Sequence, residues 1–249
     1  MPKGRTSARN LDRESGAKSI RMRPVGLNEV EAEAFGKLID AIAERRLRPG
    51  LKLVEEELAE VFSISRERIR RILLVLSQHG VVQLEPNKGA SVARLTAKER
   101  RDAFEFRRLI EQHVAAYLAQ LEPKARKEAV IGLRAHLNSE RKAISSGDRG
   151  LQIRVSAEFH LKMAAFAGNA DLLRALYDTT AKMSLALAAS DHHHELDCSM
   201  AEHSEIVAAI AKGDADLASR LCTEHLEHLE DDLQEYQEDS SDLKTLLAL

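Results

Sequence analysis

The sequence has few aromatic residues and almost no cysteine. It contains no Trp, and Phe, Trp and Tyr together make up 4% of its 249 residues. Ala, Leu, Glu and Arg are abundant instead, a mixture that favours helices over sheets. The two cysteines, Cys198 and Cys222, are too few for a disulfide framework, and they fit a protein of the reducing cytoplasm.

Long apolar runs are also missing. No stretch approaches the roughly 20 apolar residues that a membrane-spanning helix needs. The basic residues near the N-terminus are not followed by an apolar segment, so the sequence shows no secretory signal. We therefore expect a cytoplasmic protein without a membrane partner, long enough for two domains.

The two halves of the chain carry net charges of opposite sign. The net charge is −3, but residues 1–95 hold 18 Lys and Arg against 13 Asp and Glu, whereas residues 96–249 hold 19 against 27. A basic front half and an acidic back half indicate that only the front half contacts a polyanion.

Changes in composition, together with residues that break helices or form turns, divide the chain into four parts. Residues 1–29 are predicted to be a flexible basic arm, which either touches DNA phosphates or is a plain disordered tail. Residues 30–95 form the first folded domain and residues 96–235 the second. Residues 236–249 are predicted to be an acidic, solvated tail.

The first domain has the outline of a winged helix-turn-helix. Apolar spacing predicts helices over residues 30–42, 55–62 and 66–79, with Ser65 as the N-cap of the third helix and Gly80 at its end. Two β-prone runs follow, at 81–84 and 91–93, and the turn 85–89 joins them into a hairpin.

The third helix carries a basic face opposite an apolar one. Arg66 and Arg70 lie four residues apart in the half that would enter a major groove, where Arg can read guanine or bind phosphate. Lys88 stands beside Gly89 at the hairpin tip, where it would meet the DNA backbone or the minor groove. The alternative is a solvated basic face on a small helical domain. The predicted buried stripe consists of Ile69, Ile72, Leu73 and Leu76.

The second domain is predicted to be an antiparallel bundle of six or seven helices without strands. Thr96 and Glu99 form a capping box, and Pro123 suits the first turn of the following helix. Helix breaks fall at residues 145–150, 167–169 and 212–214, and residues 190–199 read as a polar loop. The fold class is thus mainly α, a winged helix-turn-helix followed by a helical bundle.

The ten histidines of the sequence differ in their expected roles as surface, core or ligand residues. The run 192–194 is either a metal-binding segment or a solvated loop, and His79 and His136 read as surface residues. His113 and His228 lie near the edges of apolar stripes and stay ambiguous. His160, His203 and His225 lie on apolar stripes, where a single histidine is more often a hydrogen-bonded core residue than a ligand.

Two of these core histidines are predicted to meet. His203 lies ten residues before Gly213 and His225 twelve residues after it, so both would lie roughly 15–18 Å from the turn of a helical hairpin. Two inward imidazoles at one level of a bundle form a plausible metal site. Spacing alone does not place His160 beside them.

Residues 47–92 resemble the winged helix-turn-helix of the GntR family of bacterial transcription regulators. The resemblance implies that Arg66 and Arg70 contact the operator. The family often has Thr-Pro where this chain has Glu67 and Arg68, and Glu67 either accepts from a cytosine amino group or repels phosphate. The matching positions are Pro49-Gly50, Leu58-Ala59, Ser65-Arg66, Ile69-Arg70, Gly80, Gly89 and Val92.

Residues 96–235 resemble the all-helical effector (FCD) domain of the FadR-type branch of that family. The matching stretches are EFRRLIEQHVAAYLA at 105–119, EFH at 158–160 with AGNADLL at 167–173, and EHSEIVAAIAKGDADLASRLCTEHL at 202–226. The resemblance implies a divalent metal ion (Zn, Ni or Mn) held by one Asp and by His160, His203 and His225. Ser156 stands at the position of the Asp.

The missing Asp leaves three alternatives for this pocket. The metal is kept, with water or an effector carboxylate in place of the Asp. Alternatively, the metal is lost and the histidines bind an organic anion directly, or the pocket is a packed relic. Arg107 points into the predicted bundle and, by the resemblance, would hold an effector carboxylate together with Ser156, although Glu111 one turn later could satisfy it internally.

The sequence therefore predicts a transcription regulator, most often a repressor in this family, and not an enzyme. It would bind a pseudo-palindromic double-stranded operator as a homodimer and respond to a small organic acid. One rival is an architectural DNA-binding protein that needs no effector. The other is a three-histidine metal hydrolase, which lacks a general base because Glu158 would point to another face.

Overall fold

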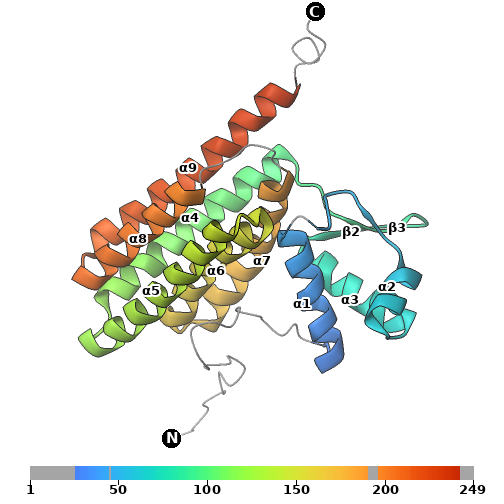
Figure 1. Ribbon diagram of the computed structural model, residues 1–249, viewed down its shortest axis with the longest axis horizontal. Coiled ribbons are helices and arrows are strands. Elements are labelled where there is room, and N and C mark those ends of the chain that lie inside the picture. Colours follow the sequence, from blue (N-terminus) through green and yellow to red (C-terminus); the bar gives the residue numbers. More distant parts are fainter. Residues whose placement is uncertain (1–25, 45, 190–195, 242–249) are drawn as a thin grey trace, which may run out of the picture.

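The computed structural model describes residues 26–44, 46–189 and 196–241, which form a small winged domain beside a helical bundle (Figure 1). We call residues 26–95 the head and residues 96–241 the bundle. Residues 1–25 of the basic arm, the histidine run 192–194 and residues 242–249 of the acidic tail lie outside the described residues. The backbone of the last helix continues to Ser241, so residues 236–241 extend that helix.

The head contains the predicted helices and hairpin. Its elements are α1 (Glu29–Ala43), β1 (Lys52–Leu53), α2 (Glu55–Phe62), α3 (Arg66–Gln78), β2 (Val82–Glu85) and β3 (Gly89–Val92). The antiparallel sheet has the order β1-β3-β2, in which the unpredicted strand β1 pairs Lys52 with Ser91. Asn28 and Glu31 form a capping box that starts α1, and Ser63 adopts a left-handed conformation (φ 54°) that turns the chain between α2 and α3.

Six helices form the described bundle, in agreement with the predicted six or seven. They are α4 (Ala97–Gln120), α5 (Pro123–Ser146), α6 (Arg149–Ala167), α7 (Ala170–Ala189), α8 (Leu196–Lys212) and α9 (Ala215–Ser241). The capping box of Thr96 and Glu99 is present at the start of α4. The predicted loop 190–199 was wrong at residues 196–199, because α8 begins at Leu196 and buries Ser199. Within the described residues, no helix is long and apolar enough to cross a membrane.

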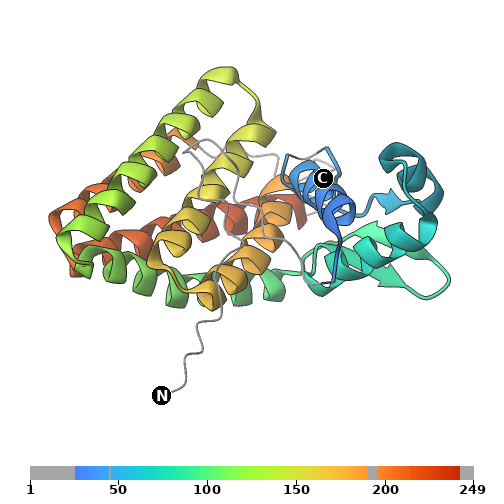
Figure 2. The same cartoon turned by 90° about the horizontal axis from the view of Figure 1, so that it is seen from below.

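The head and the bundle share one hydrophobic core. Phe35 and Ile42 of α1 and Ile69 of α3 belong to the same cluster of buried side chains as Leu161 of α6 and Leu176 of α7. Figure 2 shows α1 between the winged part of the head and the bundle, where it packs on α6 and α7. A second core lies among α4, α5, α6, α8 and α9. Helix α6 therefore contributes to both cores.

A small cavity marks the junction of the two parts. It measures about 50 Å³ and lies between α1, α6 and α7, with Asp40, Arg154, Ala157 and Tyr177 among its lining residues. This volume corresponds to a few water molecules. The junction thus combines tight apolar packing with a small space whose mainly apolar lining includes a few polar side chains.

Candidate DNA-binding face and metal centre

Helix α3 is positioned by its cap and by its apolar stripe. The side chain of Ser65 accepts a hydrogen bond from the backbone N–H of Arg68 (3.4 Å), which starts the helix where the sequence predicts. Its predicted stripe, Ile69, Ile72, Leu73 and Leu76, is buried in the head. The opposite side of α3 therefore faces outward and carries the exposed side chains of Arg66 and Arg70.

Acidic residues at the start of α2 hold the two arginines in place. Arg70 Nε lies 2.7 Å from Glu55 Oε2 and 3.0 Å from Glu55 Oε1, so both oxygens of one carboxylate accept from the Nε–H of the guanidinium. Arg66 pairs with Glu56 at 2.7 Å. These acids belong to the run Glu55, Glu56 and Glu57, whose role could not be predicted from local sequence signals because it depends on how α2 lies against α3. They fix the direction in which the arginines leave the helix.

The remaining predicted DNA-contacting residues are also exposed. Glu67 and Arg68 lie on the outside of α3, and Lys88 at the hairpin pairs with Glu85 at 2.7 Å. Gly89 has a φ of 86°, a conformation that other residues adopt only with strain, and this fixes the turn of the hairpin.

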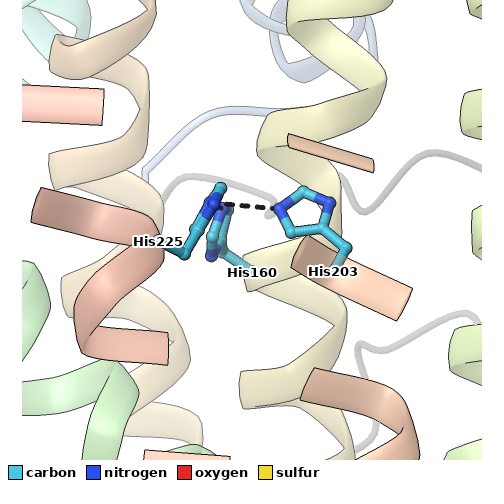
Figure 3. Close-up of side chains that lie close together, drawn as sticks. All are labelled: His160, His203 and His225. Carbon is cyan, nitrogen blue, oxygen red and sulfur yellow. Dashed lines mark hydrogen bonds between the residues drawn. The ribbon is translucent and has the colours of Figure 1, made fainter. Parts of the chain in front are cut away.

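The bundle brings three histidines from three helices together. His160 of α6, His203 of α8 and His225 of α9 are all buried, and we call them the histidine cluster (Figure 3). His225 Nε2 lies 3.2 Å from His203 Nε2 and 3.3 Å from His160 Nε2. Residues His203 and His225 thus lie side by side, as the helical hairpin predicts, and the structure adds His160.

The outward nitrogen of each of these histidines contacts a carboxylate. The contacts are His160 Nδ1 to Glu111 Oε2 at 2.5 Å, His203 Nδ1 to Glu140 Oε2 at 3.0 Å and His225 Nδ1 to Glu202 Oε2 at 2.6 Å. We call these three acids the carboxylate ring. Because an ionised carboxylate only accepts hydrogen bonds, the ring protons of His203 and His225 belong on Nδ1, whereas the close contact of His160 Nδ1 with Glu111 is not aligned as a hydrogen bond. The Nε2 atom of His225 faces the Nε2 atoms of the other two histidines.

Each member of the carboxylate ring also contacts a second basic group. The contacts are Glu111 with Arg107 at 2.6 Å, Glu140 with His136 at 3.4 Å and Glu202 with His228 at 2.6 Å. Three carboxylates and one guanidinium therefore surround the cluster, and contact with Glu202 raises the pKa of the exposed His228 on its outer side.

Burial and charge set the protonation of these groups. Burial lowers the pKa of His160 to about 4 and that of His225 to about 3, although the neighbouring carboxylates oppose this change. Burial opposes ionisation of Glu140, but His203 and His136 outweigh it and lower the pKa of Glu140 to about 2. The histidines His225 and His228 likewise lower the pKa of Glu202 to about 2. Around neutral pH the site therefore combines the neutral imidazoles of His160 and His225 with the ionised carboxylates of Glu140 and Glu202.

The histidine cluster fits a divalent metal ion. Three nitrogens at about 2.0–2.1 Å from a tetrahedral zinc ion would lie roughly 3.3 Å from one another. The two measured separations are 3.2 and 3.3 Å, and the ligand nitrogens of all three residues lie within 4.8 Å of one another. Three converging ring nitrogens with carboxylates behind them suit a divalent cation.

Two known families match this combination of head and bundle. The sequence pattern of the bacterial regulatory proteins of the gntR family matches residues 31–92, and that of the FCD domain matches residues 102–228, about half of the chain. The chain belongs to the GntR family. Its second part is an FCD domain, a domain that commonly binds a metal ion.

Similar proteins are transcription regulators from bacteria. The HTH-type transcriptional repressor RspR of Escherichia coli K12 is 24% identical over 202 residues, covering 79% of this chain and 85% of that protein. The Uxu operon transcriptional regulator of the same strain is 25% identical over 225 residues, covering 82% of this chain and 86% of that protein. These relatives confirm that this GntR-family chain is a transcription regulator and not an enzyme.

Solved structures share the fold. A GntR transcriptional regulator of Rhodococcus sp. RHA1 matches with a TM-score of 0.73 at 21% identity, covering 84% of this chain and 99% of that one. Escherichia coli McbR/YncC matches with the same TM-score and coverage at 18% identity. Both confirm the winged helix-turn-helix and helical bundle.

Ser156 does not supply a charged ligand in this GntR-family regulator. Its Oγ lies 3.4 Å from Ser199 Oγ, so the two hydroxyls join α6 to α8. Each serine lies one turn before a histidine of the cluster, His160 and His203 respectively. The negative charge around the cluster comes from the carboxylate ring, of which the sequence analysis had singled out Glu111 alone.

Arg107 points into the bundle as predicted and is buried there. Its Nε contacts Glu111 at 2.6 Å, so the internal partner considered for it is present. Its Nη2 is buried and has no hydrogen-bond partner among the described residues. One nitrogen of the guanidinium thus stays available beside the cluster.

Two histidines were wrongly predicted to lie on the surface. His136 is buried, its Nε2 donates to the backbone oxygen of Val155 (2.8 Å), and its ring stacks on Phe159. The side chain of His79 is mostly buried between Phe35 and Tyr177 and pairs with Asp178 of α7. Both lie where two helices meet, so their burial depends on tertiary packing and not on the polarity of their own helix.

Glu158, the residue considered as the general base of a hydrolase, does not contact the histidine cluster. Glu158 pairs with Arg154 at 2.8 Å and lines the cavity at the junction with the head. It lies on a different face of α6 from His160, as its spacing predicts.

Proposed function

We propose that this GntR-family chain is a repressor that binds a pseudo-palindromic operator as a homodimer and responds to a small organic acid bound with a divalent metal ion. The observation that supports this most strongly is the double role of α6. This helix carries His160 into the histidine cluster and, at the next residue, packs Leu161 into the core that it shares with the head. Binding at the cluster can therefore change the placement of the DNA-binding head.

The N-terminal half of α3 would enter the major groove of the operator. Arg66 and Arg70 are exposed on one side of this half, where a guanidinium can contact guanine O6 and N7 or a phosphate. Glu55 accepts hydrogen bonds from Nε of Arg70, so the two terminal nitrogens of the Arg70 guanidinium can face DNA. Glu67 would accept from a cytosine amino group or exclude phosphate, and Arg68 would bind phosphate.

The hairpin would supply the second contact with the operator. Lys88 is exposed beside Gly89, so its ammonium group reaches the DNA backbone or the minor groove. Ser65 contributes by holding the first turn of α3 in place.

A second copy of the chain would cover an exposed apolar face of α4. The side chains of Phe106, Leu109 and Tyr117 are 37%, 61% and 44% exposed and follow one another at helical spacing. Beside them, α4 and the turn between α6 and α7 line a hollow of about 460 Å³. A homodimer through this face would pair two heads, which a pseudo-palindromic operator requires.

The histidine cluster would bind zinc, nickel or manganese before it binds an organic acid. Without a cation, the three carboxylates behind the histidines would repel a carboxylate ligand. His160, His203 and His225 fill three positions of a tetrahedral ion and leave one open for an anion. Arg107 Nη2 would add a hydrogen bond to the same carboxylate. Ser156 would line the pocket from α6.

The experiment that tests this function follows operator release. An operator is selected from random double-stranded DNA, and its affinity for zinc-loaded and chelated protein is measured while small dicarboxylates are titrated. We expect at least one acid to change the DNA affinity of the metal-loaded protein by fivefold or more, equivalent to about 1 kcal/mol of coupling. The effector-independent architectural protein predicts no change with any acid, and that result would refute the proposal.

Substitutions separate DNA recognition from general charge. Arg66→Gln and Arg70→Gln should each weaken operator binding by about 1–3 kcal/mol. Arg174 is an exposed arginine on α7, far along the chain from α3, and Arg174→Gln serves as the matched control. Equal losses in all three variants would contradict the assignment of α3 as the recognition helix.

A further inference from the structure

We infer that the carboxylate ring of Glu111, Glu140 and Glu202 takes the place of an inner carboxylate ligand and sets the preference of the histidine cluster for a divalent cation. This inference rests on the metal site of the proposed function. It assigns the anionic part of that site to residues that do not bind the ion directly and act as positioning residues.

The first support is the threefold repetition of one arrangement. Three different helices, α4, α5 and α8, each contribute one glutamate. In each case one oxygen faces Nδ1 of a cluster histidine at 2.5–3.0 Å and the carboxylate also contacts a second basic group. A carboxylate behind a histidine fixes the orientation of the imidazole and raises its basicity toward a metal ion. Three such contacts around one cluster go beyond what packing alone requires.

The second support is charge. The carboxylate ring places three acidic groups behind the cluster against one buried guanidinium, that of Arg107, so the surroundings of the histidines favour a cation over an anion. Ser156 adds no charge to the ligand set. The neutral Ser156 is therefore consistent with a site whose charge comes from outside the ligand set.

The third support is the difference between the ring members. Glu111 and Glu140 are buried, whereas Glu202 is 26% exposed and its second partner, His228, is 61% exposed. Glu202 is therefore the member that a substitution perturbs with the smallest risk to the fold, because water can solvate the replaced group.

The test uses Glu202→Gln and Glu140→Gln in the full chain. Glutamine keeps an oxygen that accepts from histidine Nδ1 but removes the charge. Cobalt(II) is the probe, since its visible spectrum reports ligand type and geometry, and its dissociation constant is measured by titration with a competing chelator. We expect each variant to bind cobalt about 10- to 100-fold more weakly, with an unchanged spectrum, because the three nitrogen ligands remain.

Two controls make the result specific. Glu158→Gln removes the same charge from a buried residue of α6 that contacts Arg154 and no cluster histidine, so its cobalt affinity should stay within about threefold of the unchanged chain. His203→Gln removes a ligand and should abolish the spectrum. Circular dichroism and thermal unfolding establish that each variant is folded, and Glu202→Gln decides the question if Glu140→Gln does not fold.

The outcomes are distinguishable. If both ring variants bind cobalt as tightly as the unchanged chain while His203→Gln does not, the role of the carboxylate ring is refuted and the metal site stands. If Glu158→Gln weakens binding as much as the ring variants, a general charge effect replaces the inference. If the unchanged chain binds no cobalt, both the inference and the metal part of the proposed function fail.

Discussion

Arg154 Nε of α6 lies 2.8 Å from Glu44 Oε1 at the end of α1, so an ion pair joins the helix that carries His160 to the head. The acidic neighbours Glu158 and Glu44 raise the pKa of Arg154 against the effect of its partial burial. The same guanidinium lines the cavity between α1, α6 and α7. We expect this ion pair to couple the position of α6, which carries His160, to the position of the head.

Arg154→Gln should weaken the coupling between the cluster and the operator. We expect the acid-induced change in DNA affinity to fall by about two- to fivefold, within the range of energies that residues between coupled sites contribute. DNA affinity is measured with and without the acid on metal-loaded protein. Arg174→Gln on α7 is the control, and an unchanged coupling in Arg154→Gln would show that the ion pair transmits nothing.

Glu55→Gln should weaken operator binding although it removes a negative charge near DNA. Glu55 fixes the direction of the exposed Arg70 guanidinium, and such a surface pair has a modest effect, so affinity should fall by about two- to fivefold. Glu57→Gln, in the same turn of α2, controls for the loss of charge. Tighter binding by Glu55→Gln would mean that Glu55 acts by repelling phosphate and not by positioning Arg70.

Leu109→Glu should separate the proposed dimer. Placing a charge in the centre of the α4 face leaves it unpaired between two copies, so sedimentation should shift from dimer toward monomer. Val61, an exposed apolar residue of α2, provides the control substitution Val61→Glu. If the Leu109→Glu variant stays a dimer, as the Val61→Glu control should, the interface lies elsewhere on the chain.

Ser156→Asp should tighten metal binding. It adds an anionic oxygen one turn before His160, and we expect a gain of about tenfold, on the order of 1.4 kcal/mol. Isothermal titration with zinc compares it with Ser145→Asp, which adds the same charge on an exposed part of α5. A loss of affinity in Ser156→Asp would show that a carboxylate at this position does not reach the metal ion.

The metal-free protein should lose stability in acid in two stages. Burial lowers the pKa of His160 to about 4, below the ordinary 6.5. As the pH falls, the unfolded chain therefore takes up this proton at a higher pH than the folded protein does. Stability is then complete above pH 6.5 and falls as the pH drops toward 4, by about 3 kcal/mol for His160 alone. The pKa values of Glu140 and Glu202, both lowered to about 2, add a second loss between about pH 4.5 and 2. Urea unfolding of chelated protein at a series of pH values measures both stages, and a flat profile above pH 4.5 would contradict the first.

Local signals in the sequence were sufficient for most of the helices and for the hairpin. Ser65 and Thr96 are caps whose hydrogen bonds involve residues three positions away, and such short-range chemistry can be read directly. Strand β1 was missed because two residues carry no periodicity, and its existence depends on pairing with β3.

The site could be predicted only where one turn connects its parts. His203 and His225 flank the short turn at Gly213, so helical geometry alone brings them together. His160 was added by resemblance to a family. Glu140 and Glu202 gave no signal, because their contacts depend on how α5 and α8 pack against helices that are distant in the chain.

The hydrophobic core that α1 and α3 share with α6 and α7 limits how freely this head can be exchanged. A head grafted onto another bundle would leave Phe35, Ile42 and Ile69 without Leu161 and Leu176 as packing partners. Chimeric regulators made by cutting near residue 95 should therefore fold well only when α1 and the two receiving helices come from the same parent. For engineering new specificities, the transferable piece is the outer surface of α3 and not the whole head.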